Sequence, residues 1–466
     1  MVRTTSERWL TGLHEPVDDE AEVDGLDVGG ELPAGLRGAF LRNGPNPAFP
    51  PLGRYHLFDG DGMVHGVRIE DGRASYRNRW IRSKGLGVEN RAGRALYGGL
   101  ADFRLPDPEV IAEGGILKNT ANTNIVRHGG RILALIEAAP PTEITLDLDT
   151  VGEYDFGGAL AGPMTAHPKI DPGTGEMVFF GYSPIPPYVR VHSARPDGTL
   201  SWSVEVDLPR PVMLHDFVVT EHRVVLFDLP AVFNVAAAMG GGGSIVEWAP
   251  EHGARIGVLD RGAPGDAIRW IAVDPFYVFH FLNGWDDGDQ VVVEGCRAPA
   301  MSIGFDDRAS DAEPATLHRW VIDLAAGTVT EEQVDDRPGD FPRLDDRAAG
   351  RRARYGYATP FRQAEDPGLE FGGVVKYDLP AGTSEVLHWG PGEVGGEAVF
   401  APDPERTAED AGWLLCYVVD RATRATDLVV ADAQALEEVA RIRMPRRVPL
   451  GFHATWLPAG DRPASG

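Results

Sequence analysis

The stretch MVHGVRIEDGRASYRNRWI, residues 63–81, consists of two short apolar or alternating runs joined by the sequence EDGR. Glycine tolerates the positive φ that a tight hairpin turn needs, so the stretch predicts a β-hairpin. The same pattern occurs at TNIVRHGGRILALIE (123–137) and at GWLLCYVVDRATRATDLVVAD (412–432). Because such runs, separated by Gly, Pro, Asp or Asn, fill nearly the whole chain, we predict an all-β protein.

Helical periodicity is scarce, and the best candidates are the short segments VFNVAAAMG (232–240) and DAQALEEVARI (432–442). An all-β chain of 466 residues has many strand edges to protect, and radial repetition of small sheets or closure into a barrel does this. No break in composition marks a linker. We therefore predict one domain over residues 1–466, built as a β-propeller.

The charge balance excludes some classes of partner. The chain has 44 Lys and Arg against 70 Asp and Glu, a formal net charge of -26, which argues against nucleic acid as a partner. Two cysteines are too few for a disulfide framework or a thiolate metal site and suit a reducing compartment. No signal segment and no apolar run of about 18 residues is found, so we expect a soluble cytoplasmic protein, with weak peripheral membrane contact left open.

Four of the thirteen histidines share an unusual setting among apolar or small residues at the ends of predicted strands. They are His167 in MTAHPKID, His215 in VMLHDFVV, His280 in FYVFHFLN and His453 in GFHATW. A buried neutral imidazole needs a hydrogen-bond partner or a metal. The inner strands of a propeller converge on one axis, where residues distant in sequence can meet. The residues alone allow two readings, hydrogen-bonded core histidines or an iron or zinc site.

Two glutamates stand in otherwise apolar strands, Glu137 in ILALIEAAPP and Glu397 in GGEAVFAPDP. A metal-bound histidine usually donates its second N–H to a carboxylate, which would give a buried glutamate a partner. The alternative is that both are solvated glutamates at strand ends.

Ordered blocks along nearly the whole chain resemble one known family, the carotenoid cleavage oxygenases. They include GAFLRNGPNP (38–47), HLFDGDGMVHGVRI (56–69), NTANTNIVRHGGRILALIE (119–137), TAHPKIDPGTGEM (165–177), FHFLNGWDDGDQVVVEG (279–295) and GFHATW (451–456). The resemblance implies a seven-bladed β-propeller with a cap of loops and short helices over the metal. It also implies one non-haem Fe(II) per chain, held by four histidines.

The resemblance also assigns individual residues. The positions that match the family's iron ligands are His167, His215, His280 and His453, and the carboxylates that orient three of them match Glu137, Asp340 and Glu397. Asp340 stands in GDFPRLDDR, where the family usually has Glu before Phe-Pro, so this carboxylate is one methylene shorter. Thr123 matches a position that crowds one open coordination site in some members.

The reaction implied by the resemblance is cleavage of a conjugated C=C bond with O₂ to give two carbonyl products, so the partners are a hydrophobic alkene and O₂. Members that cleave hydroxylated stilbenes tend to have Lys directly before the first of these glutamates and Tyr upstream. Here the first position is Ile136, while Tyr97 and Leu100 are both candidates for the second. Because isoleucine removes a phenol-binding base, we expect a carotenoid or apocarotenoid, with a stilbenoid or other phenylpropanoid alkene as the alternative.

Two other classes of function fit the sequence less well. A metallohydrolase on a propeller would need a general base beside an open metal site, and the sequence has no HExxH and no cluster of Asp and His. A propeller that binds a hydrophobic ligand without catalysis would require either that the four histidines are dispersed in the structure or that no conjugated alkene is turned over with O₂.

Overall fold

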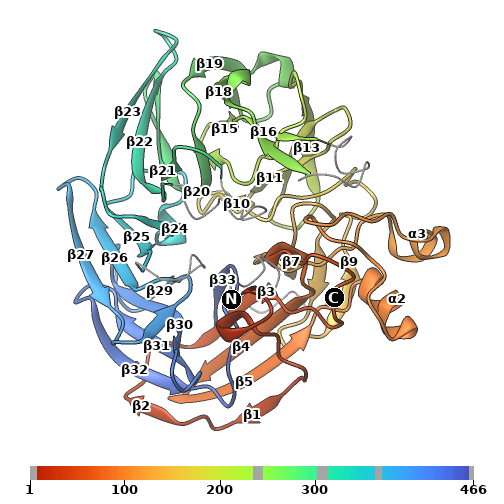
Figure 1. Cartoon of the computed structure of the whole chain (residues 1–466). Coiled ribbons are helices and arrows are strands. Elements are labelled where there is room, and N and C mark those ends of the chain that lie inside the picture. The colour runs from red at the N-terminus through yellow and green to blue at the C-terminus, as the bar shows by residue number, and fades with distance from the viewer. Residues whose placement is uncertain (1–7, 235–244, 302–312, 363–369, 461–466) are drawn as a thin grey trace.

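A computed structural model of the chain describes residues 8–234, 245–301, 313–362 and 370–460. Within these ranges, seven antiparallel sheets of four to six strands and one separate hairpin account for the paired strands. Figure 1 shows the sheets arranged around a central axis, with the chain passing from blade to blade. The predicted all-β class and the seven-bladed propeller are confirmed.

The first four blades are formed in chain order, except that the last strand of the chain, β33, belongs to blade 1. Blade 1 holds β1 (Glu22–Asp24), β3 (Gly38–Pro45), β4 (Gly62–Glu70), β5 (Arg73–Trp80) and β33 (Ala454–Pro458). Blade 2 holds β6 (Asn124–His128), β7 (Arg131–Leu135), β8 (Thr142–Ile144) and β9 (Thr150–Glu153). Blade 3 holds β10 (Lys169–Ile170), β11 (Met177–Tyr182), β12 (Val189–Ala194) and β13 (Leu200–Val206). Blade 4 holds β14 (Val218–Val219), β15 (Arg223–Asp228), β18 (Ala254–Asp260) and β19 (Arg269–Val273), and the separate hairpin is β16 (Ala231–Phe233) with β17 (Val246–Trp248).

The last three blades complete the ring. Blade 5 holds β20 (Tyr277–Asp287), β21 (Gln290–Ala298), β22 (Thr316–Asp323) and β23 (Thr328–Gln333). Blade 6 holds β24 (Gly339–Arg343), β25 (Tyr355–Pro360), β26 (Gly373–Asp378) and β27 (Thr383–His388). Blade 7 holds β2 (Val28–Gly30), β28 (Glu393–Gly395), β29 (Val399–Pro402), β30 (Gly412–Asp420), β31 (Thr426–Asp432) and β32 (Glu437–Arg443).

The hairpin at 63–81 forms as its turn residues predict. β4 and β5 pair from Glu70 opposite Arg73, which leaves Asp71 and Gly72 as the two-residue turn. Both have positive φ, 50° and 72°, the combination that matches the right-handed twist of the strands.

The two ends of the chain close the ring. β33 pairs with β3 from Arg42 opposite Ala454 to Gly38 opposite Pro458, so the last strand completes the first blade. β2 pairs in turn with β32 of the last blade. Each end of the chain thus adds a strand to the blade formed by the other end, which ties the first and last blades together and brings residues just before β33 to the axis.

Short helices connect some of the strands. They are α2 (Lys84–Ala92), α3 (Pro108–Gly114) and the 3₁₀ turns η1 (Gly12–His14), η2 (Leu57–Asp59), η3 (Pro250–His252), η4 (Gly265–Ala267) and η6 (Asp346–Ala348). None of the helices in the described ranges has the length and apolar character needed to cross a bilayer.

The prediction of a helix at residues 432–442 is wrong. β31 ends at Asp432, a turn follows, and Glu437–Arg443 form β32, which pairs with β31. Ala440 and Ile442 are buried while Arg443 is exposed and Arg441 half-buried, so the alternation of a strand prevails over a spacing that also fits a helix. In the other candidate, 232–240, Val232 and Phe233 belong to strand β16, and the segment from residue 235 lies outside the described residues.

Candidate metal centre and substrate cavity

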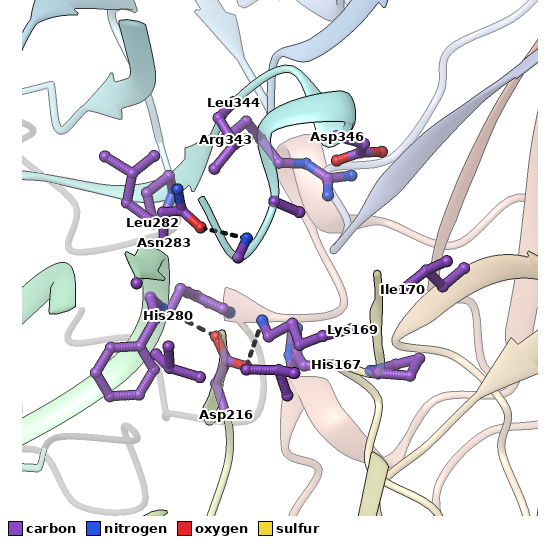
Figure 2. Close-up of a pocket in the computed structure, with 18 of the residues that line it drawn as sticks. His167, Lys169, Ile170, Asp216, His280, Leu282, Asn283, Arg343, Leu344 and Asp346 are labelled. Atoms are coloured by element: carbon purple, nitrogen blue, oxygen red, sulfur yellow. Dashed lines mark hydrogen bonds and ion pairs between the residues drawn. The ribbon is translucent and has the colours of Figure 1, made fainter. Parts of the chain in front are cut away.

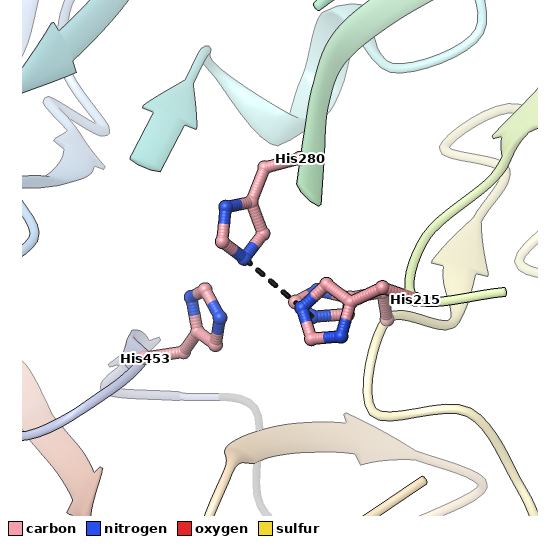
Figure 3. Close-up of side chains that lie close together, drawn as sticks. His215, His280 and His453 are labelled. Atoms are coloured by element: carbon pink, nitrogen blue, oxygen red, sulfur yellow. Dashed lines mark hydrogen bonds between the residues drawn. The ribbon is translucent and has the colours of Figure 1, made fainter. Parts of the chain in front are cut away.

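The four histidines singled out in the sequence meet on the propeller axis. His167 and His215 lie just before the inner strands β10 and β14, His280 lies on β20, and His453 directly precedes β33. All four are buried, and their candidate ligand nitrogens lie within 4.8 Å of one another. Figure 3 shows the rings of His215, His280 and His453 converging from different elements. The four histidines are therefore not dispersed, so one of the two conditions for a non-catalytic binding propeller is not met.

Packing between blades fixes the strand that carries His280. Successive side chains of a strand point to opposite sides, so where His280 faces the axis its neighbour Phe281 faces away from it. Phe281 packs on Phe227 of β15 with ring centroids 4.3 Å apart, and both belong to the same apolar core. Buried aromatic contacts of this kind hold the inner strand in one position.

The three blades that supply no histidine each supply one of the carboxylates singled out in the sequence. Glu137 follows β7, Asp340 lies on β24, and Glu397 lies between β28 and β29. Each accepts a hydrogen bond from a histidine Nδ1: Glu137 from His215 at 3.0 Å, Asp340 from His280 at 2.9 Å, and Glu397 from His453 at 3.0 Å. For His167, no carboxylate accepts from Nδ1 within the part of the chain that the structure describes.

Asp340 reaches His280 directly in spite of its shorter side chain. The pairing of β24 with β25 shifts register between Asp340 and Arg343, and Phe341 has a φ of 53°. A bulge of this kind turns side chains away from their regular direction. The backbone therefore makes up for the missing methylene.

The donor set fits a metal ion. A histidine that donates its Nδ1–H to a carboxylate presents an Nε2 lone pair, and the Nε2 of His215 lies 3.0 Å from that of His167 and 3.3 Å from that of His280. Lone pairs this close repel unless a cation lies between them. Neighbouring ligands about 2.1 Å from a first-row metal are about 3 Å apart, so the spacing suits a cation at the centre. Neutral imidazoles are ligands for Fe, Zn, Cu and Ni.

Burial and the neighbouring charges determine which of the histidines and carboxylates are protonated. Burial lowers the pKa of His453 to about 4, and burial with its histidine neighbours lowers the pKa of His167 well below its usual value. Burial alone would raise the pKa of Glu397, but the Arg343 charge and the His453 hydrogen bond bring it to about 2. His167 and His453 are therefore neutral at neutral pH and Glu397 is ionised, as metal binding requires.

Thr123 lies against the histidines. Its carbonyl accepts from the backbone N–H of His453 at 3.1 Å, and its hydroxyl donates to Oδ1 of Asn122 at 3.0 Å. The side chain is buried, and the backbone of Thr123 is thereby tied to that of His453.

A cavity of about 380 Å³ reaches Glu137, the carboxylate that holds His215, although none of the four histidines lines it. Its wall is largely apolar and includes Phe49, Phe58, Leu100, Phe103, Ile136, Met213 and Phe233. The volume and lining are those of a site for a hydrophobic small molecule.

The three pocket residues named from the sequence all line this cavity. Ile136 directly precedes Glu137, and the N–H of Leu100 donates to Oδ1 of Asp59 at 2.8 Å. The ring of Tyr97 lines the cavity, while its hydroxyl lies so close to Gly114 in α3 that a Cβ there would be 2.1 Å from it. The Tyr97 hydroxyl therefore faces the helix.

Sequence reasoning missed a charged cluster in the same wall, formed by Asp61, Glu89 and Lys118. Asp61 belongs to the block FDGDGM and Lys118 directly precedes NTANT, but no local spacing shows that the two meet. Glu89 is on α2, which the sequence did not predict as a helix.

A second cavity, of about 400 Å³, is lined by His167, His280 and His453 and has a charged wall. Figure 2 shows Lys169 and Asp216 beside His167 and His280, and the Lys169 Nζ lies 2.7 Å from Oδ1 of Asp216. Arg343, Asp346 and Arg351 also line it. Charged walls suit water and small polar species rather than a hydrophobic substrate.

Comparisons with known proteins agree with this arrangement. The family model described as retinal pigment epithelial membrane protein (RPE65) matches residues 14–458. A carotenoid cleavage oxygenase of Mycobacterium tuberculosis is 35% identical, and the alignment covers 97% of each chain. The solved lignostilbene dioxygenase of Pseudomonas brassicacearum is 30% identical with a TM-score of 0.90, covering 97% of this chain and 98% of that one. The cobalt-substituted apocarotenoid oxygenase of Synechocystis is 28% identical with a TM-score of 0.86, covering 97% and 99%.

The family match spans the propeller and all four histidines, and the resemblance noted in the sequence is confirmed. The chain is a dioxygenase and belongs to the retinal pigment epithelial membrane protein family, the family of the carotenoid cleavage oxygenases.

Proposed function

We propose that His167, His215, His280 and His453 hold one Fe(II) and that the enzyme cleaves a conjugated C=C bond of a carotenoid or apocarotenoid. The observation that carries the proposal is the convergence of four buried imidazoles, three of them held by carboxylates. The Synechocystis relative was solved in a cobalt-substituted form, and cobalt and iron are first-row metals that imidazole ligands accept.

The reaction balances without a further reductant. Each carbon of the double bond takes one oxygen atom of O₂, so a four-electron oxidation of the alkene matches the four-electron reduction of O₂. Bound among the histidines, Fe(II) would supply the redox and Lewis-acid chemistry that activates O₂.

The protein's own residues would position the reactants. Glu137, Asp340 and Glu397 hold the Nδ1 protons of their histidines, which keeps the Nε2 lone pairs directed to the centre. The apolar cavity would align the polyene so that one double bond lies at the centre, and Thr123 would limit the space beside His453.

The carotenoid assignment is supported by Ile136, which lines the cavity where stilbene-cleaving members tend to have Lys. The Mycobacterium tuberculosis relative is itself named a carotenoid cleavage oxygenase. One observation favours the second candidate, a stilbenoid or other phenylpropanoid alkene. The structure of a lignostilbene dioxygenase superposes with a TM-score of 0.90.

Exposed apolar residues support peripheral membrane contact as part of the same proposal. Leu52 and Leu117 line the apolar cavity and are exposed, and Ile116 beside them is also exposed. A hydrophobic alkene would pass from a lipid surface into the cavity here. Co-sedimentation with lipid vesicles should fall in the double variant Leu117→Ser, Ile116→Ser, and unchanged binding would remove this part of the proposal.

Anaerobic reconstitution with Fe(II), followed by O₂ and a panel of carotenoids, apocarotenals and stilbenes, tests the proposal. We expect one iron per chain and two carbonyl products from at least one alkene. His280→Ala should lose both metal and activity, while His222→Ala, which changes an exposed histidine, should keep them. Full activity after exhaustive chelation would contradict the proposal.

A further inference from the structure

Lys118 brings a charge into the wall of the apolar cavity. Its Nζ lies 2.6 Å from Oδ1 of Asp61 and 2.6 Å from Oε2 of Glu89. The side chains are 12%, 4% and 2% exposed, respectively, and all three line the cavity. Ionised groups are this deeply buried only where their hydrogen-bonding capacity is met.

The two carboxylates are already anchored. The second oxygen of Asp61 accepts from the N–H of Ala48 at 3.0 Å, and the second oxygen of Glu89 accepts from the N–H of Leu96 at 2.7 Å. The ammonium of Lys118 has three N–H donors, and Asp61 and Glu89 take two of them. No other residue in the described ranges accepts from Lys118, and Lys118 lines the cavity, so the third donor is left for an acceptor oxygen of a ligand.

Asp59 adds a carboxylate to the same wall. Its oxygens accept from the N–H groups of Leu100 at 2.8 Å and His56 at 3.0 Å. Burial raises the pKa of Asp59 to about 6, against the effect of these hydrogen bonds. The same wall therefore holds three carboxyl groups and one ammonium, which contacts Asp61 and Glu89, and the excess of acidic groups disfavours an anionic ligand.

The two other charged residues that line the cavity, Arg54 and Glu137, have partners of their own. Arg54 is exposed and donates to the carbonyl of Ala101 at 2.6 Å, and Glu137 holds His215 at the metal centre. Among the charged side chains of the cavity, the Lys118 wall is thus the buried group that is free of the metal centre.

We infer that the cavity selects an alkene that carries a neutral hydroxyl group, which accepts from Lys118 and donates to Asp59. The inference rests on the proposed function and names the substrate class more closely. A neutral hydroxyl is both acceptor and donor, so it satisfies the third N–H of the lysine and meets a carboxyl group. A deoxy analogue would leave the buried donor unpaired, and a carboxylic acid would add a charge of the wrong sign.

The test compares matched substrates on one enzyme preparation. The probes are 4-hydroxystilbene against stilbene and a 3-hydroxy-apocarotenal against its deoxy analogue, and the readout is the ratio of kcat/KM within each pair. We expect the wild type to favour the hydroxylated member by roughly tenfold to a hundredfold in at least one pair. In Lys118→Met the ratio should approach one. The ratio does not depend on the fraction of folded protein.

Lys376→Met is the matched control, because Lys376 also forms a buried ion pair, with Asp410 at 2.8 Å, and does not line the cavity. It should keep the wild-type ratio. If Lys118→Met fails to fold, Asp59→Asn, which keeps the size of the side chain, takes its place and should also lower the ratio.

Two results would overturn the inference: a wild type without preference for the hydroxyl, or a preference that survives in the cavity variants. If no alkene of the panel is cleaved, the proposed function fails. The inference is then tested separately by measuring the Kd of each substrate and its deoxy analogue through quenching of tryptophan fluorescence. Tighter binding of the hydroxylated compound that is lost in Lys118→Met would support the inference, and equal binding would contradict it.

Discussion

Asp340 keeps its contact with His280 through the backbone rather than through side-chain length. The bulge in β24 and the positive φ of Phe341 bring its Oδ1 to 2.9 Å from Nδ1. Phe341 also packs on the rings of His280 and His453, with centroids 5.1 and 4.9 Å apart. The strained residue therefore belongs to the wall of the metal centre, where such backbone conformations are often found.

Asp340→Ala should weaken metal retention by about tenfold to a hundredfold, because loss of a carboxylate that orients a ligand histidine costs about this much. Metal content after dialysis against graded concentrations of a chelator measures it. Asp378→Ala, which changes a surface ion pair with Arg354 on the same blade, serves as the control and should behave as wild type. Equal metal retention in both variants would mean that Asp340 does not hold the ligand.

Ile136→Lys should move the substrate preference toward hydroxylated stilbenes. The substitution places an ammonium in the cavity wall beside Glu137, where it can meet a phenol, and burying that charge should also lower the Tm. The kcat/KM ratio of 4-hydroxystilbene to an apocarotenal measures the change, with Ile136→Leu as the control for altered shape. An unchanged ratio would argue that this wall does not contact the substrate.

At the scale of elements, β33 has two tasks: it closes the ring and it follows the last histidine. Its pairing with β3 places Trp456 opposite Phe40 in a buried apolar cluster. His453 is held at the start of the same strand, so closure of the ring and completion of the metal centre depend on the same few residues.

A chain that ends after Leu450 should therefore lose both metal binding and thermal stability. His453→Ala should lose only the metal, because the β3–β33 pairing uses backbone groups that this variant keeps. Thermal unfolding of the two metal-free proteins separates the effects. A truncated chain as stable as metal-free His453→Ala would show that β33 does not hold the ring closed.

The elements also show what could be predicted from the sequence. The hairpin at 63–81 was predictable because its turn is local, with Asp71 and Gly72 meeting the backbone requirement by themselves. Strand β32 could not be predicted, because its residues also fit a helical spacing and become a strand only by pairing with β31. The convergence of four histidines needed the closed ring, which the resemblance implied and spacing did not show. The Lys118 cluster joins three segments through side chains alone and left no local signal.

At the scale of the whole molecule, seven blades converge on one centre and each supplies one of its histidines or carboxylates. Metal binding should therefore stabilise the entire ring rather than one blade. Free metal at a hundredfold excess over Kd adds about 2.7 kcal/mol to the stability of a protein that binds only when folded. We expect the Tm of the metal-free protein to rise with Fe(II) or Co(II), in the absence of O₂, and to stay constant in His167→Ala. A constant Tm in the wild type would contradict a metal site at the axis.

The most direct test of the central claim is the origin of the oxygen atoms in the products. The Fe(II)-reconstituted enzyme is supplied with oxygen-18 gas and a cleavable alkene, and both carbonyl products are trapped at once as oximes or reduced to alcohols before mass spectrometry. If four histidines hold an iron that cleaves the double bond with O₂, each product should carry one oxygen-18 atom, and the chelated enzyme should form no product. Products that take their oxygen from water, or that form equally without iron, would contradict the claim.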